Sequence, residues 1–175
     1  MNTQLQKQFD KLEAQRANLL GLIASLSSEQ LNAHPEGKWS IAQIISHLIT
    51  SEQLSVKYLH KKMLGIHETP NTGIAEEFKM LALVVSQRLP LKFKAPKILL
   101  DDTITYPTSD QLTAEWDKIR GEIKELLPRF QDDQLKRKVY KHPIAGKINI
   151  QQALQFFWEH INHHTPQVKN LLQPK

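Results

Sequence analysis

Residues 150–164 have the sequence Ile-Gln-Gln-Ala-Leu-Gln-Phe-Phe-Trp-Glu-His-Ile-Asn-His-His, and both the fold and the candidate site follow from this stretch. Its apolar residues recur at the i, i+3, i+4, i+7 spacing of one helix face, which predicts an amphipathic helix that packs against the core. The predicted buried stripe consists of Ile150, Ala153, Leu154, Phe157, Ile161 and Val168.

Two histidines, His160 and His164, fall inside this apolar stripe. They are four residues apart, so their side chains lie one helical turn above the other. Imidazoles in a core-facing stripe are costly unless each finds a polar partner. One divalent cation would satisfy both, and an i, i+4 histidine pair is a common way to present two ligands to a metal. The alternative is a core histidine pair that bonds to the backbone or to Glu52.

The rest of the chain shows the same helical periodicity in several segments, separated by loops that contain Pro and Gly. Pro166 lies inside the last segment and should kink or end that helix; the apolar residues beyond it favour a kink. Strand signals are weak, because the alternation over residues 138–147 is too short to build a sheet. Long helices are predicted near residues 4–26, 41–64, 109–127 and 149–172.

A shorter helix is predicted from Ile74 to about Gln87, with Phe78, Leu81, Ala82 and Val85 facing inward. After it, a long connection crosses residues 88–108, and two prolines within residues 89–97 exclude a regular helix there. The fold class predicted is therefore all-α, a four-helix bundle with an additional short helix and one long crossover connection.

The helix that begins after Trp39 offers a third histidine. Ser40 and Gln43 have the spacing of a capping box, which places the start of this helix at residue 41. His47 lies beside the buried face of the helix, so it is the best candidate for a third metal ligand. Glu52 also points toward the buried arc, where it could orient His47 or act as a base near the metal.

Length and composition limit the number of domains, the types of metal ligand and the classes of partner. The chain has 175 residues, which favours a single domain over residues 1–175, and it has no cysteine, so a metal site must use His, Asp, Glu or water. The net charge is +5, but the 23 basic residues are interleaved with 18 acidic ones, so we do not expect nucleic-acid binding. We find neither a signal peptide nor a membrane-spanning run, and we expect a cytoplasmic protein without membrane contact.

Three segments resemble the DinB-like superfamily, which includes the YfiT-type metal-dependent hydrolases. Trp39-Ser40-Ile41-Ala42-Gln43-Ile44-Ile45-Ser46-His47-Leu48 resembles the signature of its second helix, and Glu52 stands where many members carry an acid. His142-Pro143-Ile144-Ala145-Gly146-Lys147 resembles the turn before its last helix. His160-Ile161-Asn162-His163-His164-Thr165-Pro166-Gln167 resembles its closing H-x-x-H-H-x-x-Q signature. The three occur in the family's order, over most of the chain.

The resemblance implies a bundle of four long helices, usually a homodimer, that holds Ni or Zn with three histidines. The matching positions are His47, His160 and His164, the residues that the periodicity also selects. Characterised members include thiol S-transferases that use bacillithiol or mycothiol, and a maleylpyruvate isomerase that uses mycothiol.

Two classes of function are therefore expected. The first is a metal-dependent hydrolase or thiol S-transferase that acts on a small molecule, with a low-molecular-weight thiol as a candidate co-substrate. The second is a non-catalytic bundle that binds a metal or ligand, for example in a stress response. A homodimer is expected in both cases, since apolar residues lie on more than one side of the first two long helices.

Overall fold

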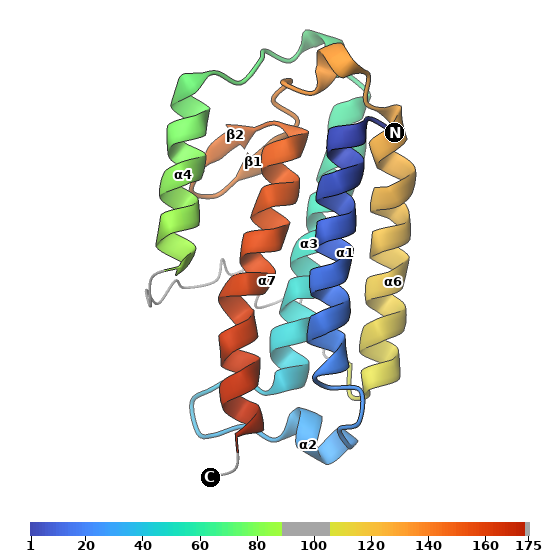
Figure 1. Ribbon diagram of the computed structural model, residues 1–175, viewed down its shortest axis with the longest axis vertical. Coiled ribbons are helices and arrows are strands. Elements are labelled where there is room, and N and C mark those ends of the chain that lie inside the picture. The colour runs from blue at the N-terminus through green and yellow to red at the C-terminus, as the bar shows by residue number, and fades with distance from the viewer. Residues whose placement is uncertain (89–105, 174–175) are drawn as a thin grey trace.

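A computed structural model describes residues 1–88 and 106–173 of the chain. Four long helices, α1, α3, α6 and α7, lie side by side, and α4 packs on the outside against α7 (Figure 1). This arrangement confirms the predicted all-α four-helix bundle with an additional short helix. The helices are α1 (Thr3–Gly21), α2 (Ser28–Asn32), α3 (Ile41–Met63), α4 (Ile74–Arg88), α6 (Ser109–Leu126) and α7 (Ile150–Leu172), and the short 3₁₀ turns are η1 (Ile66–Glu68), η2 (Leu127–Arg129) and η3 (Asp132–Gln134).

Polar side chains cap the starts of the helices that carry the candidate site. At α3, the hydroxyl of Ser40 accepts a hydrogen bond from the backbone N–H of Gln43 at 3.1 Å, and the Gln43 side chain accepts one from the N–H of Ser40 at 2.9 Å. Asn149 and Gln152 form the same reciprocal pair at the start of α7. These caps satisfy backbone groups that would otherwise lack partners, and they fix the position of each helix along its sequence.

The stripe predicted for α7 is buried along its whole length, from Ile150 to Val168. The helix continues through Pro166 to Leu172, so the alternative in which the proline ends it is wrong. A proline in a helix interior removes one backbone hydrogen bond, and the buried Val168 beyond it shows that packing continues past that point.

None of the helices in residues 1–88 and 106–173 is long and apolar enough to cross a membrane.

The prediction for the inward face of α4 is wrong. Phe78, Leu81 and Val85 are 68%, 58% and 50% exposed, whereas Met80, Leu83 and Val84 are buried. The cause is that α4 carries apolar residues on two sides, and periodicity alone cannot tell which of the two arcs faces the bundle.

The apolar residues of α1 and α3 also differ from expectation. Every large apolar side chain that is strongly exposed in the described residues lies outside these two helices. Within the predicted segments 4–26 and 41–64 the exceptions are Leu22 and Leu64, so most of the apolar surface on which the expectation of a homodimer rested is part of the core.

A short hairpin precedes α7. Strands β1 (Tyr140–His142) and β2 (Gly146–Ile148) pair antiparallel, with Tyr140 opposite Ile148. Gly146 has a φ of +73°, a conformation that glycine adopts without strain. The sequence predicted too little strand here, although the turn within residues 142–147 is as the resemblance implied. Most of the predicted connection over residues 88–108 lies outside the described residues.

Candidate metal centre

The candidate centre lies where the first half of α3 meets the second half of α7. These two helices run in opposite directions (Figure 1), so His47, two turns into α3, lies beside His160 and His164 of α7. The three side chains are 4%, 9% and 8% exposed, so they are almost completely enclosed. The structure therefore brings together the three histidines that the sequence selected.

The Nε2 atoms of the three histidines converge. The Nε2 atom of His160 is 3.3 Å from that of His47 and 3.2 Å from that of His164, and the three candidate ligand atoms lie within 4.8 Å of one another. Two nitrogens bound to one ion at about 2.0–2.1 Å with a tetrahedral angle are roughly 3.3 Å apart. The donor set and its spacing thus fit a divalent cation.

Burial keeps these imidazoles neutral, the protonation state that metal binding needs. It lowers the pKa of His47 to about 4 and the pKa of His164 to about 3. The pKa of His160 lies well below its ordinary value, first because of burial and then because of the neighbouring His164 and His47. At neutral pH the cluster carries no charge of its own, so a bound cation would keep its full charge.

The hydrogen bond of His164 sets its tautomer. Its Nδ1 atom is 3.1 Å from the side-chain oxygen of Gln167, the distance of an N–H···O hydrogen bond. An Nδ1–H donor leaves the Nε2 atom unprotonated and directed at the cluster. In contrast, the Nδ1 atoms of His47 and His160 have no hydrogen-bond partner among residues 1–88 and 106–173, so within these residues neither ring is bonded to the backbone or to Glu52.

Aromatic rings enclose the cluster. The indole of Trp39 lies against His47, with 5.1 Å between ring centroids, and Phe156 stacks on His160 at 5.3 Å. These apolar neighbours exclude water from the imidazoles and fix their orientation.

Glu52 is not part of this centre, which corrects the role expected for it. Its carboxylate accepts hydrogen bonds from Trp116 Nε1 at 2.9 Å and from Arg120 Nη2 at 2.7 Å, and both donors belong to α6. Burial raises the pKa of the Glu52 carboxyl, and Arg120 acts in the opposite direction. Glu52 makes no hydrogen bond to His47 in the described part of the chain, so the expected role of orienting that ring is not seen.

The pattern shared by the DinB superfamily matches residues 11–168 of the chain. The chain belongs to the DinB superfamily. Its relatives include YuaE of Bacillus subtilis (strain 168), an uncharacterized protein that is 25% identical over 150 residues, or 85% of this chain and 87% of YuaE. YfiT of the same organism is 24% identical over 169 residues, which cover 96% of this chain and 84% of YfiT.

The solved structure of YfiT matches this DinB chain with a TM-score of 0.63 and 22% identity, over 98% of this chain and 87% of YfiT. YfiT is described as a probable metal-dependent hydrolase with an unusual four-helix bundle topology. At this level of identity the match shows a shared fold.

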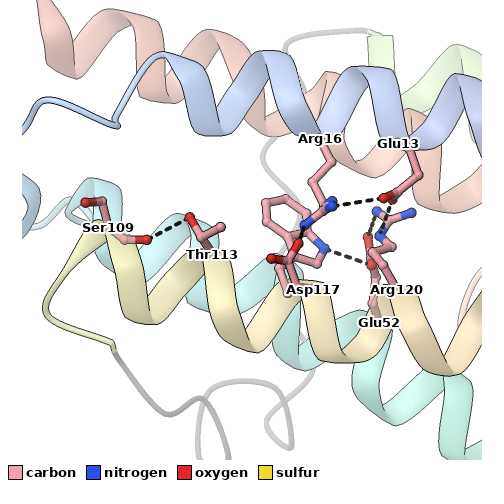
Figure 2. A network of polar contacts seen from close by, with 8 residues as sticks. Glu13, Arg16, Glu52, Ser109, Thr113, Asp117 and Arg120 are labelled. Atoms are coloured by element: carbon pink, nitrogen blue, oxygen red, sulfur yellow. Dashed lines mark hydrogen bonds and ion pairs between the residues drawn. The ribbon is translucent and has the colours of Figure 1, made fainter.

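Sequence reasoning missed Arg120, which completes a buried polar network in the DinB bundle (Figure 2). Its side chain is 2% exposed, and it pairs with Glu52 and, at 3.5 Å, with Glu13 of α1. Arg16 of α1 in turn bonds to Glu13 and to Asp117 of α6. The signal was available, because Arg120 follows Trp116 by four residues and therefore lies on the apolar stripe of α6.

Two further histidines have structural contacts. The Nδ1 atom of His142 accepts hydrogen bonds from the backbone N–H groups of Ile144 and Ala145, both at 3.1 Å, as expected for a turn residue. His163 lies beside His164 and places its Nδ1 atom 2.8 Å from the carbonyl oxygen of Gln87 at the end of α4. This contact ties α4 to the helix that carries two of the three candidate ligands.

A separate cavity lies between α1, α4 and α7. It has a volume of about 240 Å³ and is lined by residues of α1, α4 and α7, among them Lys11, Arg88 and Trp158. Lys11 places its Nζ atom 3.8 Å from the centre of the Trp158 ring, and Arg88 pairs with the buried Glu159 at 2.7 Å. The cavity does not include the three clustered histidines, and its charged side chains already have partners.

Proposed function

We propose that His47, His160 and His164 bind one divalent metal ion, Ni or Zn, and that the protein is a metal-dependent hydrolase of a small molecule. The observation that carries the proposal is the convergence of three neutral Nε2 atoms from two helices at separations of 3.2 and 3.3 Å. Imidazole ligands suit Zn and Ni, and three of them leave coordination positions open.

A divalent ion in such a site lowers the pKa of a bound water or thiol and so supplies a nucleophile at neutral pH. The chain itself would contribute the rest of the site. The three histidines hold the ion without offsetting its charge, Gln167 fixes the tautomer of His164, and Trp39 shields the ring of His47. The YfiT description as a probable metal-dependent hydrolase agrees with this proposal.

Thiol S-transfer to a small molecule is the second candidate, and the absence of cysteine favours it over any reaction that needs a thiol from the chain. The thiol would have to arrive as a low-molecular-weight co-substrate. We also infer that the protein acts in the cytoplasm, where such thiols are kept reduced.

The test begins with metal analysis of protein purified without a His tag. Titration calorimetry with Zn and Ni then compares metal-stripped wild type with His47→Ala, His160→Ala and His164→Ala. We expect one site per chain in wild type and at least tenfold weaker binding in each variant. His34→Ala, at an exposed position outside the cluster, is the matched control and should bind like wild type.

Activity is then measured with the loaded protein on activated esters and amides, with and without added thiols. Hydrolysis that disappears in all three variants supports a hydrolase, and strict thiol dependence supports a transferase. Tight binding with neither activity would favour the non-catalytic alternative. Equal affinity in wild type and all three histidine variants would overturn the site.

A further inference from the structure

The outer face of α4 is apolar, although nothing in the described part of the chain covers it. Of the eight large apolar side chains that are strongly exposed there, four belong to this one helix. They are Ile74 at 72%, Phe78 at 68%, Leu81 at 58% and Val85 at 50% exposure. A helix that is apolar on two sides is normally covered on both.

The four side chains form one continuous stripe. At about 100° per residue they fall within a narrow arc, and the exposed Ala75 and Ala82 lie along one edge of it. We name this surface, which consists of Ile74, Ala75, Phe78, Leu81, Ala82 and Val85, the α4 stripe. Its large side chains together present roughly 400 Å² of apolar area, within the range of the largest apolar patch on a typical monomer, which is often functional.

The spacing of the α4 stripe is symmetric about its own midpoint. The successive spacings along the stripe, from Ile74 to Phe78, then to Leu81 and then to Val85, are four, three and four residues. A helix that pairs with another helix shows this alternation. A second α4 that lies antiparallel about the same midpoint places Ile74 opposite Val85 and Phe78 opposite Leu81. The stripe is therefore complementary to itself, as an interface with two-fold symmetry requires.

The residues at the edges of the α4 stripe also favour a second copy of this helix as the partner. The small side chains Ala75 and Ala82 allow two helix backbones to approach closely along that edge. Glu77 and Lys79 border the stripe with opposite charges, whereas a membrane-binding helix would carry mainly Lys and Arg there.

We propose that the α4 stripe is the surface through which two copies of this chain associate, with the two α4 helices antiparallel. The large side chains of two copies would bury roughly 800 Å² in total, and the alanines and edge residues bring the interface near the lower limit for a specific complex. A dimer that dissociates in the micromolar range is therefore expected. This inference does not depend on the metal site, and it replaces the surface of α1 and α3 that the sequence suggested.

Sedimentation velocity from about 1 to 100 µM tests the association. We expect the mass to rise from that of the 20.2 kDa chain toward twice that value. Phe78→Glu and Leu81→Lys should each weaken association at least tenfold, with unchanged circular dichroism because both positions are exposed. An equimolar mixture of the two variants should recover dimers, since antiparallel pairing sets Glu against Lys. Leu64→Glu, at a position 85% exposed and outside the stripe, is the matched control.

Cysteine crosslinking tests the orientation, because the chain contains no cysteine of its own. A mixture of Phe78→Cys and Leu81→Cys should form a disulfide between the two variants on mild oxidation, whereas Leu64→Cys should crosslink at least tenfold less. A wild-type protein that stays monomeric up to 100 µM overturns the proposal. A dimer that is unaffected by both charged variants, or that crosslinks as well through residue 64, overturns it too.

Discussion

The histidine cluster and the Glu52–Arg120 network are both polar groups inside the same bundle, and both use α3. They differ in whether their polar atoms and charges are matched by partners inside the protein. Both oxygens of Glu52 accept hydrogen bonds from side chains of α6, and the charge of Glu52 is matched by that of Arg120. The histidines are neutral, and their Nε2 atoms face one another with no opposite charge between them.

The difference separates a structural role from a binding role. A buried ion pair whose carboxylate oxygens both accept hydrogen bonds joins helices, and its two opposite charges leave no net charge for a ligand to balance. Three imidazole nitrogens within 4.8 Å of one another have the capacity to bind a ligand, because one cation can accept a lone pair from each of them. Glu52 and His47 are only five residues apart on α3, so the distinction depends on the opposing helix.

The largest expected effect comes from breaking the charged network. Glu52→Ala leaves the guanidinium of Arg120 buried at 2% exposure, and its remaining ion pair in the described part of the chain is the 3.5 Å contact with Glu13. We expect the free energy of unfolding to fall by about 3–5 kcal/mol, because an uncompensated buried charge is strongly destabilising. Urea denaturation of metal-stripped protein measures it.

His47→Ala is the matched comparison on the same helix. It removes an imidazole whose Nδ1 atom is buried without a partner, so the loss of packing is partly offset by the loss of a desolvated polar group. Its effect on unfolding should be about 1 kcal/mol. Equal losses in Glu52→Ala and His47→Ala would remove the proposed distinction between the two regions.

The next largest effect on the free energy of unfolding should come from acidification, which acts through protonation of the histidines. In the metal-stripped protein, burial lowers the folded-state pKa of His47 to about 4 and that of His164 to about 3. Unfolded histidine titrates near 6.5, so the unfolded state binds more protons below that pH, and stability falls as pH decreases. The shift of His47 from 6.5 to about 4 corresponds to at most about 3 kcal/mol, lost between these two pH values.

Unfolding free energies measured at intervals from pH 7.5 to 4 provide the check. The variant with His47, His160 and His164 all replaced by Ala should show a shallower decline than wild type over this interval. If the two slopes are the same, the three imidazoles are not held neutral by the fold.

The sequence predicted the clustering of the three histidines correctly, but the same reasoning could not identify the partner of Glu52. The positions of His47, His160 and His164 follow from helical periodicity within single helices, and the DinB resemblance selects the same residues. The partner of Glu52 depends on which helix lies opposite α3, and periodicity within α3 carries no information on that. Arg120 and Glu52 together would have indicated an ion pair, since each is a charge on an apolar stripe.

The same limit explains the error at α4. Its two apolar arcs have similar periodicity, and the choice between them is made by contact with α7 rather than by the sequence of α4 itself. Helix starts were predicted well where side chains cap them, as at Ser40 and Asn149, because a cap is a local interaction. At α6 the cap is Thr108, and the helix begins at Ser109, as predicted.

A smaller effect is expected at the hydrogen bond that supports the histidine cluster. Gln167→Ala removes the acceptor at 3.1 Å from the Nδ1 atom of His164, so the tautomer of that ring is no longer fixed. Loss of such a supporting bond typically weakens metal affinity by about 10–100-fold. Zinc titration of Gln167→Ala and of Gln167→Glu, which keeps an acceptor, should show the loss only in the alanine variant.

The smallest net effect should come from replacing both partners of the charged network. In Glu52→Gln/Arg120→Met neither of the two positions carries a charge, and the amide oxygen of the introduced glutamine can still accept the hydrogen bond that Trp116 Nε1 donates to Glu52 at 2.9 Å. A buried ion pair replaced by groups of similar volume is often close to neutral in stability. We expect the free energy of unfolding of the double variant to lie within about 1 kcal/mol of wild type, although Glu52→Gln and Arg120→Met alone each lose more. Zinc affinity should stay at the wild-type value throughout this cycle, because neither residue contacts the histidines; a coupled loss of metal binding would show that the two regions are one site.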